Sequence, residues 1–327
     1  MNRATRILPL LLAATLLAGC EQVSEYTGEL PDLKLVLYSF VRPDSMVRVD
    51  VHQTRYFSNN SSELPREVTG EVHVNGQLAG TLYPTPRSPW ELAVQHVADV
   101  YPRPGDRVRV TARAEGMPEA SAEVTVPADT VPIRVDTTLL GNPGKLERVH
   151  YTLHINDTAR ERHYYRLIVE TETYEVVDGE RYNSTRHYAF SPENDPLLVG
   201  SNNTWINEDV VPNRYHIFTN ETFEGTGYTM RVSAGARNTT RFEYAHDGQT
   251  IGQRNVMKHH VTVVRIDEDT YLHLKSLMLL EMGEGVMEPV QVHANVHGGV
   301  GIIGYAVYST VTFEMPEVHV QESGYIN

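Results

Sequence analysis

Cysteine is almost absent from this chain of 327 residues, which holds only Cys20. A small secreted domain stabilised by disulfides needs several cysteines. That class is therefore excluded, and we expect the fold to be stabilised by its hydrophobic core. A long apolar run is missing as well. The N-terminal run begins at Ile7 and ends at Leu17, whereas a membrane-spanning helix needs about 20 apolar residues.

Basic residues are scarce relative to acidic ones. The chain has 28 Lys and Arg residues against 42 Asp and Glu residues, for a formal net charge of −14. Nucleic-acid binding depends largely on Lys and Arg contacts to phosphates, so we expect no nucleic-acid partner. The same imbalance argues against a basic patch that would attach the protein to a membrane surface.

The first twenty residues have the order of a secretory leader. Arg3 and Arg6 precede the apolar run, and Leu17, Ala18, Gly19 and Cys20 follow in that order. A basic start, a short apolar stretch and small residues are typical of a signal peptide. The last four residues resemble the lipobox of bacterial lipoproteins, in which the cysteine is lipidated. We therefore predict a signal peptide at 1–19, a lipid anchor on Cys20 and a polar tether at 20–32.

Residues 33–127 alternate between apolar and polar side chains over short segments. Such alternation predicts half-buried strands, and Asn75-Gly76 fits a two-residue hairpin turn between two of them. Short strands at this spacing predict an immunoglobulin-like β-sandwich, although the cysteine pair and core Trp of antibody domains are absent. The strand candidates are 33–40, 46–54, 68–74, 77–83, 91–97, 106–114 and 120–126.

Residues 131–327 are predicted to form a second β-rich domain, after a proline-containing boundary at 126–132. One segment, 269–282, instead has apolar residues at helical spacing and predicts an amphipathic helix packed on the second sheet. Asp267 or Asp269 is the expected N-cap. The fold class is therefore mainly β with one helix. The strand candidates are 146–156, 163–177, 226–234, 258–266, 290–296 and 305–313, and an extended loop is expected at 190–213.

Gly299, Gly301 and Gly304 spell G-x-G-x-x-G, the spacing of a dinucleotide-binding loop. That loop requires a helix after the glycines, whereas residues 305–313 alternate as a strand does. We therefore predict no nucleotide and no other cofactor. The glycines are expected to allow a bend or bulge between antiparallel strands, or the close approach of another backbone.

Histidine is frequent, with fifteen in the chain, but no metal site is predicted. His150 and His154, like His293 and His297, are four residues apart in predicted strands. A four-residue step along a strand covers about 13 Å, too far for both side chains to bind one ion. His259 and His260 should point to opposite faces. We interpret these histidines as solvated strand residues.

No catalytic residue can be named. A G-x-S-x-G nucleophile elbow is absent, and a carboxylate pair for glycoside hydrolysis can be recognised only in three dimensions. Trp205 lies in a polar stretch; it either plugs the core of the second domain, which we favour, or stacks on a ligand. No ligand-binding residues are predicted.

Several motifs together resemble a known family. They are LVLYSFVRPDSMVRVDVHQT, HVNGQLAGTL and YPRPGDRVRVTARAEGMPEASAEVTVP in the first half, with IDEDTYLHLKSL and EPVQVHANVHGGVGIIGYAVYS near the end. This combination resembles a lipoprotein family of Bacteroidota known as domain of unknown function 4249. The resemblance implies an outer-membrane lipoprotein, often encoded beside a TonB-dependent receptor, and it implies no catalytic residues.

We therefore expect a lipid-anchored accessory or binding protein of the cell envelope, the partner of a TonB-dependent transporter. Two alternatives stay open: a structural or adhesive surface lipoprotein, and a carbohydrate-active enzyme. Glu21 and Gln22 follow Cys20 in place of a clear acidic run of the kind that directs surface export. The expected membrane face, periplasmic or outer surface, therefore stays open too.

Overall fold

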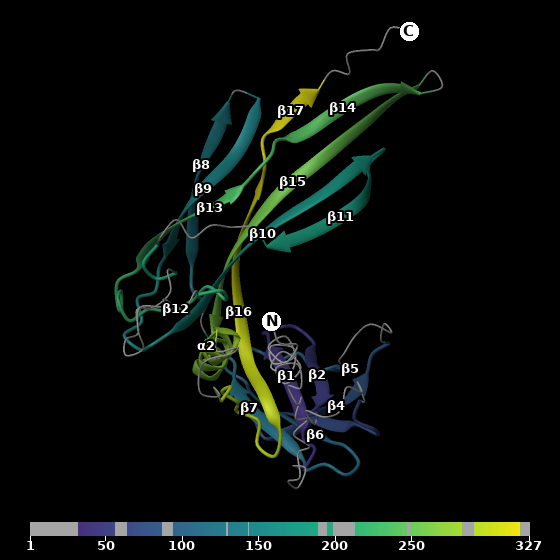
Figure 1. The fold of residues 1–327 in the computed structure, drawn as a ribbon, viewed down its shortest axis with the longest axis vertical. Helices are drawn as coiled ribbons and strands as arrows, with labels where there is room; N and C mark the ends of the chain where they lie inside the picture. Colours follow the sequence, from purple (N-terminus) through teal and green to yellow (C-terminus); the bar gives the residue numbers. More distant parts are fainter. Residues whose placement is uncertain are drawn as a thin grey trace, which may run out of the picture.

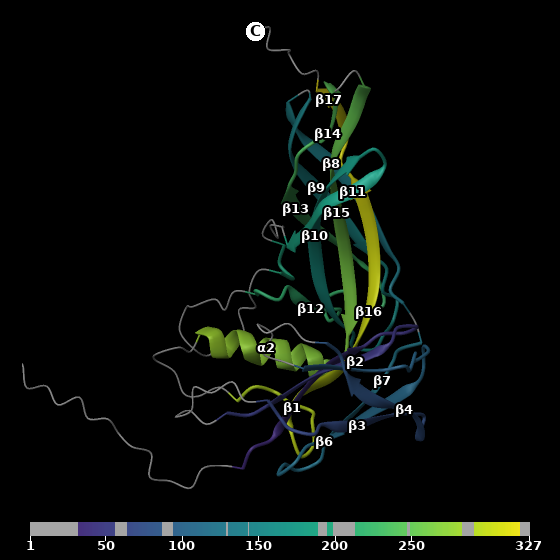
Figure 2. The same ribbon diagram turned by 90° about the vertical axis from the view of Figure 1, so that its right-hand side faces the viewer.

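The computed structural model describes residues 32–55, 64–86, 94–128, 130–142, 144–188, 195–198, 213–246, 249–282 and 291–320. These residues form a β-rich molecule with one helix, in which long strands rise from a smaller body at one end (Figures 1 and 2). The predicted class, mainly β with a leading sandwich and a single helix, is confirmed. Among the described residues, no helix combines the length and the hydropathy that crossing a membrane requires.

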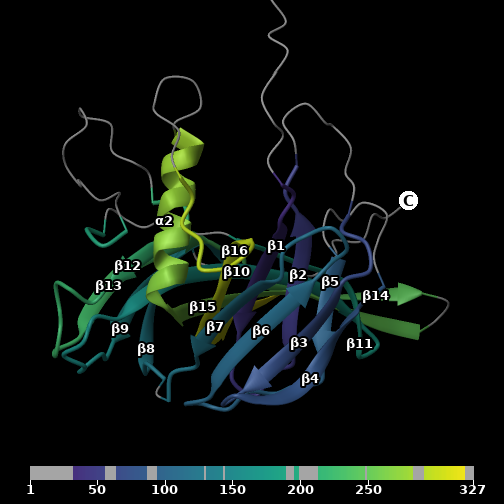
Figure 3. The same ribbon diagram turned by 90° about the horizontal axis from the view of Figure 1, so that it is seen from below.

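The first part of the chain forms a sandwich of two sheets, β16-β1-β2-β5-β4 and β4-β3-β6-β7, which share β4 (Figure 3). Its hairpin turn has Asn75 and Gly76 at φ 53° and 82°, as the sequence predicts. Its strands are β1 (Leu35–Val41), β2 (Val47–Gln53), β3 (Thr69–Val74), β4 (Gln77–Pro84), β5 (Val94–Ala98), β6 (Arg107–Arg113) and β7 (Ala120–Thr125).

The second part is a sandwich of a three-stranded sheet, β13-β9-β8, facing a longer sheet built around β15. In the longer sheet, β10 lies on one side of β15, and β16 and β14 follow one another along the other side. The strands are β8 (Ile133–Asn142), β9 (Lys145–Ile155), β10 (Tyr164–Val177), β11 (Glu180–Tyr188), β12 (Ile217–Thr219), β13 (Tyr228–Gly235), β14 (Thr239–His246), β15 (Gln249–Ile266), β16 (Val300–Glu314) and β17 (Glu317–Val320).

Strand β16 belongs to both parts of the molecule (Figure 1). Its first half pairs in parallel with β1, from Val36↔Val300 to Val41↔Tyr305. Its second half pairs antiparallel with β15. As a result, Val296 and Ile303 complete the core of the first sandwich, although they lie near the C-terminal end of the chain.

The glycine-rich segment forms the parallel pairing of β16 with β1, so the predicted bend between antiparallel strands is wrong. The predicted close approach of another backbone is confirmed. A Cβ at Gly299 would lie 2.7 Å from the carbonyl oxygen of Leu35, and one at Gly301, where φ is 103°, would collide with the backbone of Leu37. A strand follows the glycines, as expected, and not the helix that a dinucleotide site requires.

Helix α2 (Glu268–Met282) lies crosswise to the long strands at the junction of the two parts (Figure 2). Asp267 is its N-cap, since Asp267 Oδ1 accepts a hydrogen bond of 2.6 Å from the amide of Thr270. Leu274 and Met278 pack with Val264 and Ile266 in a third buried cluster. The predicted helix on the second sheet is therefore confirmed, and it begins one residue earlier than expected.

The predicted strand at 290–296 is wrong, because residues 291–296 have no strand structure. Their polar groups bond to the helix and to β16 through side chains. The amide of His293 donates to Ser276 Oγ at 2.9 Å, and Asn295 uses its side chain to bond both backbone groups of Ile303, at 3.0 Å and 2.9 Å. The side-chain amide of Asn295 thus takes the place of the backbone hydrogen bonds that a strand at 290–296 would form.

Candidate functional site

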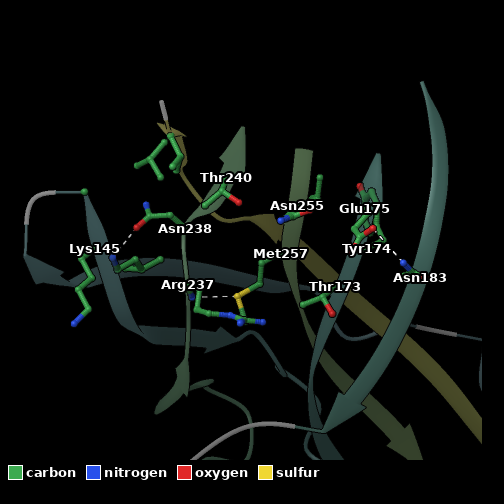
Figure 4. A pocket seen from close by; sticks show the side chains of 15 residues that line it. Lys145, Thr173, Tyr174, Glu175, Asn183, Arg237, Asn238, Thr240, Asn255 and Met257 are labelled. Atoms are coloured by element: carbon green, nitrogen blue, oxygen red, sulfur yellow. Dashed lines mark hydrogen bonds between the residues drawn. The ribbon is translucent and has the colours of Figure 1, made fainter. Parts of the chain in front are cut away.

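A cavity of about 550 Å³, which we call the distal cleft, lies in the second sandwich. Figure 4 shows its lining side chains. Segments from both of its sheets line the cleft. The lining residues are Gly144, Lys145, Leu146, Thr173, Tyr174, Glu175, Asn183, Arg237, Asn238, Thr240, Asn255, Val256, Met257, Val318 and Val320.

Asn238 fixes one wall of the distal cleft. Its Oδ1 accepts a hydrogen bond of 2.7 Å from the amide of Leu146, and its Nδ2 donates to the carbonyl of Pro316 at 3.1 Å. These two bonds join the three-stranded sheet to the end of β16. The neighbouring Arg237 donates its backbone amide to Met257 Sδ at 3.1 Å. Its guanidinium has no hydrogen-bond or ion-pair partner among the described residues, so it is available to a ligand.

The opposite wall is shaped by an irregularity in β10. The pairing of β10 with β11 shifts register between Thr173 and Glu175, and such a bulge redirects side chains. Glu175 Oε2 accepts a hydrogen bond of 3.1 Å from Asn183 Nδ2. Figure 4 shows Glu175 and Asn183 across the cleft from Lys145 and Asn238. The cleft therefore has a cationic side and a side with one carboxylate.

The chemistry of the lining suits a polar, extended ligand. The side-chain amides of Asn183 and Asn255 bond to Glu175 and Gln253 through one group each. The other group, Oδ1 of Asn183 and Nδ2 of Asn255, can accept from or donate to a peptide backbone. Met257 and the valines add apolar contact. Glu175 is the single carboxylate among the described lining residues. The carboxylate pair that glycoside hydrolysis needs is thus not present in that lining.

A second set of polar residues is buried near the junction, where the residues bond to one another. Asp157 Oδ2 accepts hydrogen bonds from Tyr165 Oη at 2.6 Å, Asn220 Nδ2 at 2.9 Å and His163 Nδ1 at 3.0 Å. Burial would raise the pKa of Asp157, but the bonds from Tyr165 and the Ala159 amide, together with His163, outweigh it and lower that pKa. We call Asp157, His163, Tyr165 and Asn220 the buried polar cluster.

The buried Arg265 and the exposed Glu161 extend the buried polar cluster. Arg265 Nη2 lies 2.8 Å from His163 Nε2, and Glu161 Oε1 lies 3.1 Å from the same nitrogen. Arg265 can only donate, so a hydrogen bond from it uses the lone pair of Nε2, whereas a bond to Glu161 uses Nε2–H; Nε2 forms one of these two bonds at a time. His163 is in contact with charged groups on both sides, yet it is 6% exposed, so it is closed to a substrate.

Histidines that are close together in the sequence do not share a binding site in the structure, because they bond to other side chains. His154 Nε2 lies 2.9 Å from Asp136, and His293 Nε2 lies 2.8 Å from Asp269. His259 and His260 point to opposite faces, as predicted, but His259 is fully buried and bonds to Tyr151 Oη at 2.6 Å. The interpretation of these residues as solvated is therefore wrong for His259. No cluster of three or more metal-ligating side chains occurs in the part of the chain that the structure describes.

Cys20 and Trp205 lie outside the described residues, so their predicted roles stay predictions. The same holds for most of the predicted loop at 190–213. Its described part, 195–198, forms a turn in which Leu198 is buried in the core of the second sandwich.

Comparison with protein families gives one match, to the model of a domain of unknown function, DUF4249, over residues 23–312. The chain belongs to the DUF4249 family. This membership confirms the family resemblance that the motifs indicate. The lipoprotein and Bacteroidota parts of that resemblance stay predictions. No curated protein matches this family member.

The residues of the distal cleft were not predicted from the sequence. They come from several strands and a turn, and each contributes one or two side chains, so no local spacing identifies them. The only local signal is Arg237-Asn238 at the break between β13 and β14, where two polar residues interrupt the alternation. Such a break is common in any β protein.

Proposed function

We propose that this protein is a lipid-anchored accessory protein of the cell envelope, that it binds a partner through the distal cleft, and that the partner is a TonB-dependent outer-membrane transporter. The observation that carries the anchor is the order of Arg3, Arg6, the apolar run and Cys20 at the N-terminus. The transporter is the partner that the family resemblance implies.

The arrangement of the described chain supports this proposal. The described residues begin at Asp32, next to β1 in the first sandwich. The distal cleft lies in the other sandwich, and β16 joins the two parts (Figures 1 and 4). A protein tethered before β1 would thus hold its cleft away from the membrane surface, where it is accessible to a partner.

The chemistry of the cleft indicates what part of a partner it receives. Its amides and its unpaired Arg237 suit an extended polar segment with at least one acidic side chain, such as a loop between transmembrane strands. Binding of a polar segment in the cleft differs from an adhesive role, which would depend on an exposed apolar patch. It also differs from a hydrolase, which needs a second carboxylate near Glu175.

Affinity capture tests the proposal. The full-length protein, expressed in its own host and extracted in mild detergent, should retain a TonB-dependent receptor. Arg237→Ala combined with Asn238→Ala should reduce the receptor recovered by about tenfold, since a charge-assisted bond and a fixed amide are lost. Arg109→Ala, an exposed change on β6, is the control and should have no effect.

Two results would contradict this assignment. If the protein is repeatedly recovered without any receptor, the proposed partner is wrong. If the double variant and the control recover equal amounts of receptor, the distal cleft is not the binding site. Protease treatment of intact cells determines the membrane face: cleavage of the protein places it on the outer surface, and protection places it in the periplasm. If the double variant does not reduce receptor recovery, the proposal of a lipid anchor is not affected.

A further inference from the structure

A second cavity, of about 330 Å³, lies where the first sandwich meets the outer face of the long sheet. We call it the junction pocket. Its floor is one row of side chains across three strands: Ile168 on β10 is paired with Thr262 on β15, and Thr262 is paired with Thr310 on β16. The two threonine hydroxyls are 2.9 Å apart and bond to each other.

One wall of the junction pocket joins the two parts of the molecule. Arg42 follows β1 in the first sandwich, and Tyr308 lies on β16 in the second. The guanidinium carbon of Arg42 lies 4.2 Å from the centre of the Tyr308 ring, a cation–π contact. Tyr308 is 41% exposed. The pair thus presents an aromatic ring and a planar cation at the rim of the pocket.

The other wall is an ion pair. Arg186 Nη2 lies 2.6 Å from Glu170 Oε2, and both residues line the pocket. A paired arginine and carboxylate offer fixed donors and acceptors to neighbouring hydroxyl groups of a ligand. Because the pair is held on two adjacent strands, β11 and β10, its geometry is set by the sheet before a ligand arrives.

The charge of the pocket is unusual for this chain. The protein has a net charge of −14, yet the charged lining residues of this pocket are two arginines and one glutamate. Glu170 neutralises Arg186, and Arg42 has no carboxylate partner among the described residues. An arginine without a carboxylate is a ready partner for one in a ligand, since its planar fork matches that group in two bonds.

We propose that the junction pocket binds a sugar acid of one or two rings, with its carboxylate on Arg42. The Thr262 and Thr310 hydroxyls and the Glu170–Arg186 pair then face the ligand hydroxyls, and Ile168 and Tyr308 contact its C–H face. The volume lies at the low end of the range for ligand pockets, which fits a ligand of this size. The site is separate from the distal cleft and does not depend on the lipid anchor.

Titration calorimetry with glucuronate as the probe tests the proposal on the purified soluble Cys20→Ser protein. Glucuronate should bind, and Arg42→Gln should weaken it by about tenfold or more, because a charge-assisted bond is lost. Glucose, which lacks the carboxylate, should bind at least about tenfold more weakly than glucuronate for the same reason. Arg109→Gln, which removes an exposed arginine of the first sandwich outside the pocket, should bind as the parent does.

The outcomes are distinct. Equal affinity for glucuronate in Arg42→Gln and in the parent would overturn the proposal, as would equal binding of glucose or a complete lack of binding. Acetate that binds as tightly as glucuronate would show that the hydroxyl-facing wall contributes nothing, which also overturns it. Thermal unfolding of Arg42→Gln checks the fold; because the residue is exposed, its melting temperature should match that of the parent. None of these results bears on capture by the distal cleft.

Discussion

The carboxylate of Asp267 joins helix α2 to strand β16: its Oδ2 accepts a hydrogen bond of 2.5 Å from the amide of Tyr305, while its Oδ1 caps the helix. Tyr305 stands where β16 leaves β1, opposite Val41. One side chain thus connects the helix with the strand that runs through both sandwiches. This bond places α2 across the junction of the two parts.

Asp267→Ala should destabilise the protein by about 2 kcal/mol or more. The change removes an N-cap and leaves the Tyr305 amide without its acceptor, and each loss costs about 1 kcal/mol or more. Urea unfolding measures the effect. Asp136→Ala, which removes exposed pairs with Arg134 and His154, is the control and should cost at most about 1 kcal/mol. An equal cost in the two variants would show that Asp267 does not hold the junction.

Gly301→Ala should weaken the parallel pairing of β16 with β1. A Cβ at this position meets the backbone of Leu37, and φ is 103°, so the strand must shift. We expect a loss of about 2 kcal/mol or more in thermal or urea unfolding. Gly235→Ala is the matched control, because a Cβ there meets nothing within 4 Å. A neutral Gly301→Ala would contradict the close approach of the two strands.

The stability of the protein should fall as the pH is lowered from about 6.5 to about 4. Burial, with a smaller effect of His260, lowers the pKa of His259 to about 4, below its usual value of about 6.5. The unfolded chain binds a proton in this window and the folded chain does not, so acid favours unfolding. At one pKa unit per 1.4 kcal/mol, His259 contributes up to about 3 kcal/mol of this loss.

His259→Gln tests the assignment of that pH dependence. Glutamine does not titrate and can still bond to the Tyr151 hydroxyl, so the variant should lose less stability than the parent between pH 6.5 and 4. The control is His319→Gln, an exposed change on β17 that should leave the slope as it is. Urea unfolding at several pH values gives the slopes, and identical slopes in all three proteins would rule out His259 as the source.

Asp157→Asn should cost about 2–4 kcal/mol of stability. The change replaces a carboxylate oxygen that accepts from Tyr165, His163 and Asn220 by a neutral amide, and it leaves Arg265 with less buried negative charge nearby. Asp136→Asn, at an exposed carboxylate, should cost at most about 1 kcal/mol. Urea unfolding of both variants compares them, and equal small effects would mean that the buried polar cluster adds little stability.

Much of the strand content could be predicted from the sequence, because strands with one buried face alternate. Strand β1 buries every second side chain, as do β2 from Val47 to Val51 and β9 from Val149 to Ile155. Strand β11 cannot be predicted from the sequence, because all nine of its side chains are exposed and they show no alternation of apolar and polar residues. Strand β15 begins nine residues before the predicted one at 258–266, in a stretch rich in polar residues.

Long-range relationships could not be predicted. Nothing in the local pattern indicates that Val36 pairs with Val300, or that Asn295 would bond to Ile303 in place of a ladder. The distal cleft and the junction pocket depend on such pairings, since their residues meet only when distant strands align. Helix α2 was predictable because its cap and apolar spacing lie within one segment.

The most direct test of the proposed lipid anchor is the intact mass of the protein purified from the membranes of its own host. We expect a mature chain that begins at Cys20 and carries the added mass of a glyceride and its acyl chains, and we expect Cys20→Ser in the soluble fraction. An unmodified Cys20 with residues 1–19 still attached would contradict the account.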